Sequence, residues 1–316
     1  MSPCLSVVIP VYNADKYLPA CMNSLLSSEG IEDTEILLID DGSTDLSGSI
    51  IDDYSDKYNN IHAYHKKNEG AAAARNYGIN EASGTYIFFL DSDDRVDSSL
   101  FKEVIEKTKN VSDEVILWDC GLNYETNNLL SRKDPGYFAH CGLDRIEKTY
   151  TGKQIIEILN TKGKGLIASV CFGAYRRSFL IDNNLYLEAG IIYEDELWVP
   201  RVFIKAKEVL YFPEKVYQYR VHDNSVTNPD PDILEKNVKT LMYVYPALYK
   251  YYDDVLTEDK LKEAVEGNLT KRYLHMIYKY RFWRYECGKN IDKKLLWRTA
   301  RKLRHKAMVL MLNLFV

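Results

Sequence analysis

The chain has 316 residues, of which 46% are hydrophobic and 28% are charged, values that are ordinary for a globular protein and exclude wholesale disorder. This length accommodates one large α/β domain with an appendage, or two modest domains. The formal net charge of -5 argues against nucleic acid as a partner, because proteins that bind polyphosphate chains present strongly basic surfaces.

The first hundred residues alternate between strand and helix patterns. Short apolar runs rich in β-branched residues predict buried strands over residues 5–10, 35–39, 61–65 and 86–90. Helical periodicity predicts a helix with Asn13 as its N-cap, a second helix capped by Ser43-Thr44-Asp45, and a third over residues 71–82. This βαβα order predicts a parallel sheet that is covered by helices on both faces.

The pattern is less regular beyond residue 120. Residues 121–151 form a polar stretch that predicts either a loop or a hairpin insertion. The elements predicted next are a helix over 154–159, a strand over 170–176, a helix start at 193–198, and a strand pair over 209–212 and 216–222. Asn228-Pro229-Asp230-Pro231 is typical of a boundary. We therefore predict an α/β domain over 1–228 and a helical extension over 229–316, with helices at 232–252, 258–284 and 290–312.

Three polar clusters follow strands of the predicted sheet. Tyr12-Asn13 follows the first strand, Asp40-Asp41 follows the second, and the run from Asp91 to Asp94 follows the fourth. Ligands of parallel α/β sheets bind at the carboxyl ends of the strands. We therefore expect these clusters to converge on one site.

Five segments, taken in order, carry a family resemblance: LSVVIPVYNADKYL, ILLIDDGSTD, NEGAAAARNYGI, GTYIFFLDSDD and YEDELW. Together they resemble the family-two group of inverting glycosyltransferases, which have the GT-A fold. The resemblance covers about residues 4–225 and is weakest between residues 120 and 165. It implies a Rossmann-like, mainly parallel sheet flanked by helices, and an enzyme that moves a sugar from a nucleotide-diphosphate sugar to an acceptor hydroxyl.

The Asp91-Ser92-Asp93 turn is the expected metal site. Carboxylates two residues apart, just past a strand, can both approach a hard cation such as Mn²⁺ or Mg²⁺, which neutralises the charge of a nucleotide diphosphate leaving group. The resemblance implies Asp93 as the main metal ligand, Asp91 as a ribose or second metal contact, and Ser92 as part of the nucleotide-sugar site. Asp94 is expected to support the turn. The alternative is a solvated acidic turn that caps the next helix.

The donor is expected to contact residues that follow the first three strands. Asp41 fits an acceptor for a uracil N3–H, and Tyr12 fits a ring that stacks on the base, by position and by resemblance. The resemblance also places Pro10 in this site and directs Arg75 toward the base or the pyrophosphate. Asp40 either joins the site or holds the loop. The alternatives are a turn with a helix cap at Asp41, a packed ring at Tyr12 and a surface arginine at Arg75.

Inversion requires in-line attack by an acceptor oxygen with a base behind it. Glu194 and Asp195 occupy the family's Glu-Asp position, so the resemblance implies Asp195 as the general base and Glu194 as a group that orients the acceptor. The alternative is an acidic first helical turn favoured by the helix dipole. Near the end of the resembling region, His222 is expected to complete the metal shell or touch phosphate, and Arg220 and Ser225 are expected to bind the pyrophosphate. A structural histidine remains the alternative for His222.

The expected enzyme is a metal-dependent hexosyl- or N-acetylhexosaminyl-transferase of polysaccharide biosynthesis in the cell envelope. A UDP-sugar is the expected donor, and a glycan or lipid-linked glycan is the expected acceptor. One alternative is a nucleotidyltransferase, although no glycine-rich, lysine-bearing loop follows the first strand. Another is a catalytically inactive GT-A-like subunit, against which the intact Asp91, Asp93 and Asp195 argue.

The end of the chain is basic and apolar. From Lys289 onward there are eight Lys or Arg against one acid, Asp292, interleaved with apolar residues that include Trp297. For residues 289–316 this pattern predicts either contact with an anionic membrane or packing on the protein itself or in a homo-oligomer. No signal peptide and no run of ~20 apolar residues is evident. A cytoplasmic protein is therefore expected, peripheral at the inner face of the cell membrane if residues 289–316 bind lipid.

Overall fold

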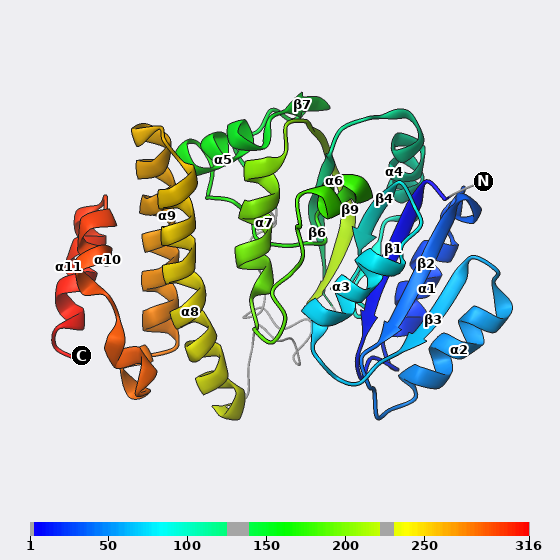
Figure 1. The fold of residues 1–316 in the computed structure, drawn as a ribbon, viewed down its shortest axis with the longest axis horizontal. Helices are drawn as coiled ribbons and strands as arrows, with labels where there is room; N and C mark the ends of the chain where they lie inside the picture. Colours follow the sequence, from blue (N-terminus) through cyan, green and yellow to red (C-terminus); the bar gives the residue numbers. More distant parts are fainter. Residues whose placement is uncertain (1–2, 125–138, 222–230, 316) are drawn as a thin grey trace.

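The computed structural model describes residues 3–124, 139–221 and 231–315 (Figure 1). Within these ranges a nine-stranded sheet with helices on both faces adjoins a group of helices from the C-terminal segment. The hydrogen-bonded strand order is β3-β2-β1-β4-β8-β6-β9-β5, and β7 pairs with β9. The architecture is therefore the predicted α/β sheet followed by a helical extension.

The first half of the sheet is parallel. Its strands are β1 (Leu5–Val11), β2 (Thr34–Asp40), β3 (Ile61–His65) and β4 (Tyr86–Phe89). β1 pairs with β2 and β4, and β2 pairs with β3. β1 and β2 are buried almost throughout because both faces of the sheet are covered, which explains their unbroken apolar sequences. The four predicted strands are confirmed, and their carboxyl ends lie at one edge.

The helices of this half are α1 (Leu18–Leu26), α2 (Ser47–Lys57), α3 (Ala71–Glu81) and α4 (Ser98–Asn110). The prediction that Asn13 caps α1 is wrong. Asn13 has a left-handed φ of 48°, and its carboxamide oxygen accepts a hydrogen bond from Thr44 N at 2.8 Å. Asparagine tolerates this conformation better than most residues. Through the hydrogen bond from Thr44, Asn13 links the loop after β1 to the loop after β2.

The second half of the sheet is mixed and was harder to predict. Its strands are β5 (Arg95–Val96), β6 (Val115–Tyr124), β7 (Lys148–Tyr150), β8 (Gly173–Arg176) and β9 (Val209–Val221). Neither β5 nor β6 was predicted, and β9 is one strand instead of the expected pair. Both ends of β9 run parallel to β6, and the register shifts where β9 contains Pro213. Proline cannot donate to the ladder, so the strand bulges there without reversing.

A buried polar network fills the register shift between β6 and β9. Asp119 is fully buried and accepts hydrogen bonds from His140 N at 3.0 Å and from the Tyr211 hydroxyl at 3.1 Å, and it pairs with Arg145. Burial alone would raise the pKa of Asp119, but the hydrogen bonds from His140 and Arg145 lower this pKa to about 2. The network therefore anchors the chain that follows residue 138 to the sheet.

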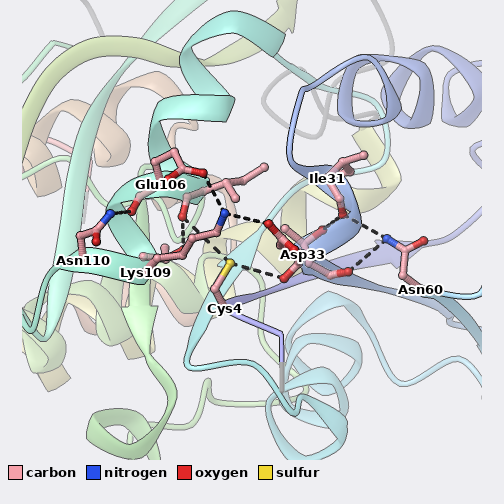
Figure 2. Close-up of polar contacts among 10 residues, drawn as sticks. Cys4, Ile31, Asp33, Asn60, Glu106, Lys109 and Asn110 are labelled. Carbon is pink, nitrogen blue, oxygen red and sulfur yellow. Dashed lines mark hydrogen bonds and ion pairs between the residues drawn. The ribbon is translucent and has the colours of Figure 1, made fainter. Parts of the chain in front are cut away.

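A second set of polar contacts links the segments at the amino edge of the sheet (Figure 2). Lys109 of α4 binds the Asp33 and Glu106 carboxylates, each at 2.7 Å. The Cys4 thiol donates to the Asp33 carbonyl at 3.4 Å, and the Asn60 carboxamide donates to carbonyls on both sides of Asp33. These contacts join α4 and the turn before β3 to the short helix η1 (Ile31–Asp33), which precedes β2.

The helical extension packs on α5 and α7 of the α/β part. The remaining helices of the α/β part are α5 (Gly152–Thr161), α6 (Arg177–Asp182) and α7 (Glu194–Lys205). The extension contains α8 (Pro231–Val255), α9 (Asp259–Lys279), α10 (Lys293–Thr299) and α11 (Leu303–Leu312). The boundary predicted at residue 228 lies outside the described residues. No helix in the described ranges has the length and apolar character that crossing a bilayer requires.

The prediction of one helix over residues 290–312 is wrong. The backbone is extended at Ala300 and Lys302, so the segment forms two short helices, α10 and α11, which both contact α9. The Thr270 hydroxyl of α9 donates to the buried Thr299 hydroxyl at 2.6 Å and fixes the end of α10. Each short helix has its own buried residues: Leu296 and Thr299 on α10, and His305, Val309 and Leu312 on α11.

Candidate functional site

An arginine joins two acids at the carboxyl edge of the sheet. Arg75 of α3 donates from Nη2 to Asp91 Oδ1 at 2.7 Å and from Nη1 to Glu194 Oε1 at 2.6 Å. Its side chain is buried, which favours the neutral guanidinium, but the carboxylates of Asp91 and Glu194 outweigh this and raise the pKa of Arg75. Asp91 follows β4 and Glu194 begins α7, so one side chain draws together acids that are far apart in the sequence.

The acidic turn after β4 divides into exposed and buried members. Asp91 and Asp93 are half-buried, whereas Asp94 is 1% exposed and accepts hydrogen bonds from the Tyr217 hydroxyl and from Arg220 N at 2.6 Å. Burial, and then the charges of Asp93 and Asp91, raise the pKa of Asp94 well above its usual value. Asp94 therefore holds the turn against β9, as the sequence predicted.

The exposed part of this turn fits a divalent cation. Asp91 and Asp93 offer hard carboxylate oxygens, and Arg75 bonds to Oδ1 of Asp91, so Oδ2 remains to face a metal. The described residues contain no group of three or more potential ligands, and the predicted ligand His222 lies outside them, as does Ser225. Magnesium commonly binds through one or two carboxylates together with substrate phosphates, so two protein carboxylates are a sufficient set.

The loops after β1 and β2 lie at the same edge. Asp41 is buried, and its two oxygens accept hydrogen bonds from Glu69 N at 3.0 Å and Gly70 N at 2.7 Å, which fixes the start of α3. Asp40 accepts from Ser43 N at 2.9 Å and contacts His65 at 3.0 Å, so it holds the loop. Pro10, in β1, is half-buried, and the Tyr12 ring, just past β1, is 52% exposed. This ring is accessible to a stacking partner.

The first turn of α7 gathers three acids. Tyr193, immediately before the helix, has a left-handed φ of 63°, an uncommon conformation for a residue other than glycine. Burial raises the pKa of Asp195 well above its usual value, and the negative charges of Glu194 and Glu196 raise this pKa further. Asp195 Oδ1 accepts one hydrogen bond, from Glu196 N at 2.9 Å. This arrangement makes Asp195 more basic than an ordinary aspartate.

The extension contributes residues to this turn that the sequence did not reveal. Arg272 of α9 forms an ion pair with Glu196 and donates to the Leu166 carbonyl at 3.3 Å. The Tyr193 hydroxyl lies 3.5 Å from the Tyr280 hydroxyl and 3.5 Å from the Asn237 carboxamide nitrogen. No motif surrounds these residues, and their partners are remote in the sequence, so only the folded chain identifies them.

Comparison with known proteins gives consistent results. A model of glycosyl transferase family 2 matches residues 6–183. The uncharacterized glycosyltransferase EpsJ of Bacillus subtilis is 30% identical over 254 residues, which cover 80% of this chain and 71% of the relative. The structure of S. aureus TarS 1–349 in complex with UDP-GlcNAc matches with a TM-score of 0.65 and 18% identity, over 97% of this chain and 78% of that chain.

A second solved structure is the mannosyltransferase PcManGT from Pyrobaculum calidifontis in complex with GDP-Man and Mn²⁺. It matches with a TM-score of 0.59 and 13% identity, over 99% of this chain and 80% of that chain. The similarity to solved structures extends through the helical extension as well as the sheet. The GT-A fold expected from the sequence is therefore confirmed.

Proposed function

The chain belongs to glycosyl transferase family 2, and from this premise we propose that it transfers a sugar from a UDP-sugar to a hydroxyl of a glycan or lipid-linked glycan, with inversion at the anomeric carbon. The proposed sugar is a hexose or an N-acetylhexosamine. Support for a UDP donor comes from TarS, whose structure contains UDP-GlcNAc. PcManGT contains GDP-Man instead, so the preference for uracil rests on the loops after β1 and β2.

In the proposed donor complex, Tyr12 stacks on the uracil and Asp41 accepts its N3–H. Each carboxylate oxygen of Asp41 already accepts one backbone hydrogen bond and can accept a second, so the backbone contacts orient the group without saturating it. Ser92 and Pro10 complete the proposed donor site. Arg75 is proposed to contribute by fixing Asp91 and Glu194, and by adding a positive charge near the pyrophosphate.

We assign the metal site to Asp93 and Asp91. When bound, Mn²⁺ or Mg²⁺ would stabilise the negative charge of the departing UDP. The presence of Mn²⁺ in PcManGT supports this assignment, and the pair of half-buried carboxylates fits a hard cation. The contact between Arg75 and Asp91 Oδ1 orients the carboxylate at this site. His222 remains a proposed further ligand.

The proposed base is Asp195. The acceptor oxygen forms a bond to the anomeric carbon, the bond from that carbon to the UDP oxygen breaks, and the acceptor proton moves to the Asp195 carboxylate. The raised pKa of Asp195 supports this role, because a more basic carboxylate takes the proton more readily at neutral pH. Glu194, held in place by Arg75, is proposed to orient the acceptor hydroxyl.

The observation that carries the proposal is the double contact of Arg75. It joins the proposed metal ligand Asp91 to the turn that bears the proposed base, across 103 positions of sequence. An inactive subunit would not need several carboxylates close together at the carboxyl edge of the sheet. A nucleotidyltransferase would need a phosphate-binding loop after β1, where this chain has Asn13 in a contact with Thr44.

The test is release of the nucleoside diphosphate from a panel of UDP-, GDP- and dTDP-sugars, with and without Mn²⁺. We expect UDP release only when Mn²⁺ is present. Asp93→Ala should lower turnover by about 10²–10³-fold, the scale for removing electrostatic stabilisation of a leaving group, and should abolish metal-dependent donor binding while the melting temperature stays unchanged. Asp53→Ala, at an exposed position on α2, is the matched control and should behave as wild type.

Three results would contradict the proposal. Full turnover of Asp93→Ala in saturating Mn²⁺ would show that the metal site is elsewhere. Release of pyrophosphate from a nucleoside triphosphate, in place of UDP release, would favour a nucleotidyltransferase. Absence of both donor binding and turnover across the panel would favour an inactive subunit.

A further inference from the structure

Helix α11 has apolar residues on two opposite faces. The inward face, formed by Val309 and Leu312 with His305 beside them, is buried. The outward stripe has the same helical spacing but faces solvent, with Leu303 exposed by 87% and Leu314 by 80%. The outward stripe comprises Leu303, Ala307 and Leu310 of α11, together with Leu314 in the turn that follows the helix. A helix of a globular protein normally buries its apolar residues, so the outward stripe needs a partner.

Basic residues border the outward stripe on both sides. On a helix with 3.6 residues per turn, Arg304 falls on one side of the stripe and Lys306 on the other. Neither of these two residues, nor Lys302, has an ion-pair partner in the described part of the chain, whereas Arg301 lies 3.6 Å from Glu263 and Glu266. Residues 293–315 contain no Asp or Glu at all.

A tryptophan extends the same surface onto α10. Trp297 is 42% exposed, and Lys306 Nζ lies 5.1 Å from the centre of its ring. The two short helices lie at the outer edge of the molecule, with α8 and α9 between them and the sheet (Figure 1). The surface is therefore an outward-facing combination of leucines, a tryptophan and lysine or arginine, which is the composition that favours the boundary between lipid head groups and acyl chains.

We infer that the outward stripe of α11, together with Trp297 and the basic residues beside it, binds a membrane rich in anionic phospholipids. The leucines enter the interface, α11 lies in the plane of the bilayer, and the lysine and arginine side chains contact phosphate groups. A second copy of the chain fits less well. A two-fold interface would place this patch against itself, and its positive charges would repel with no acid to offset them.

The experiment is sedimentation of the full chain with large unilamellar vesicles of phosphatidylcholine, either pure or mixed equally with phosphatidylglycerol. We expect the protein to pellet with the anionic vesicles and to stay in solution with pure phosphatidylcholine. Arg304→Gln/Lys306→Gln should weaken binding by about fivefold for each charge removed. Leu303→Ser/Leu310→Ser should weaken binding by about a hundredfold or more, the scale expected for two leucines that no longer enter the interface.

Matched controls lie far from the patch. Lys205→Gln/Lys207→Gln removes two exposed charges, and Ile146→Ser removes an exposed apolar side chain; both should bind vesicles as wild type does. The inference is overturned if wild type does not pellet with anionic vesicles, or if the α11 variants pellet equally well. It is also overturned if ultracentrifugation shows a dimer that the leucine variant dissociates while lipid binding is absent. None of these readouts depends on sugar transfer, so failure here leaves the proposed function intact.

Discussion

The two edges of the central sheet both hold acids, yet the partners of those acids differ. At the amino edge, Glu35 is 8% exposed and accepts hydrogen bonds from neutral groups: the hydroxyls of Ser6 and Ser83, and the backbone N–H groups of Ser83 and Gly84. At the carboxyl edge, Glu194 and Asp91 share one arginine, and Asp195 lies between two further acids. The first arrangement spreads one charge over many dipoles, whereas the second concentrates like charges.

We propose that this difference separates structural from functional carboxylates. A carboxylate that is saturated by backbone donors stabilises the fold, and its removal leaves those donors without partners. Like charges held close together cost stability, and proteins keep such clusters where a ligand or a reaction uses them. Glu35 of the amino edge should therefore matter for folding, and the clustered acids Asp91, Glu194 and Asp195 of the carboxyl edge should matter for transfer.

The largest effect is expected for Asp195→Asn. The amide keeps the shape of the side chain but cannot take the acceptor proton, so transfer should fall by about 10²–10⁴-fold. Donor affinity should change little, because the proposed donor contacts lie on other elements. The ionised Asp195 has a folded-state pKa above its unfolded value and is unfavourable at neutral pH, so the melting temperature should stay the same or rise. Calorimetric UDP affinity, transfer rate and thermal unfolding check the three parts together.

Asp195 also sets the expected pH dependence in the wild-type enzyme. A base acts only when deprotonated, and burial with the neighbouring Glu194 and Glu196 charges raises its pKa. The transfer rate should therefore decline as pH falls through this raised pKa, at a higher pH than an ordinary aspartate would give. A rate that stays constant down to the usual aspartate range, or near-normal transfer by Asp195→Asn, would move the role of base to Glu194 or Glu196.

At the opposite edge, Glu35→Ala should show the reverse pattern. It leaves the Ser83 N–H without its acceptor and takes one of two acceptors from the buried Gly84 N–H, which keeps its hydrogen bond to the Ser6 hydroxyl. We expect a loss of about 1–3 kcal/mol of unfolding free energy. Below its lowered melting temperature the variant should transfer sugar at the wild-type rate. Glu32→Ala, an exposed acid of the same edge, is the control and should change neither quantity. A Glu35→Ala enzyme with wild-type stability and lost activity would break the distinction between the two edges.

The sequence predicted the structure well where apolar residues form an unbroken run and where a motif directly follows a strand. The apolar runs of β1 to β4 and the acids after β4 were predicted close to their observed positions. β6 was missed because polar residues, including Asp119 at the register shift, interrupt its apolar run. Asn13 was misassigned because its partner, Thr44, belongs to another loop. Contacts of that kind carry no periodic signal, and the ion pair between Glu196 and Arg272 was invisible for the same reason.

That ion pair gives the smallest and most discriminating prediction. Glu196 contributes to the raised pKa of Asp195, and Arg272 offsets the Glu196 charge from the extension. Arg272→Gln should therefore raise the pKa of Asp195 further and shift the acidic limb of the rate profile to higher pH. At neutral pH we expect about a tenfold loss of transfer, within the range for members of one salt-bridge network. Arg272→Lys keeps the charge and should retain most of the rate.

The double variant Arg272→Gln/Glu196→Gln decides between an electrostatic and a structural role. Removing both charges restores neutrality beside Asp195, so the acidic limb should return toward lower pH and the rate at neutral pH should recover. If Arg272 only holds α9 against α7, the double variant loses the contact just as the single variant does. In that case both variants would melt at lower temperature, neither would shift the pH profile, and raising the pH would not restore transfer.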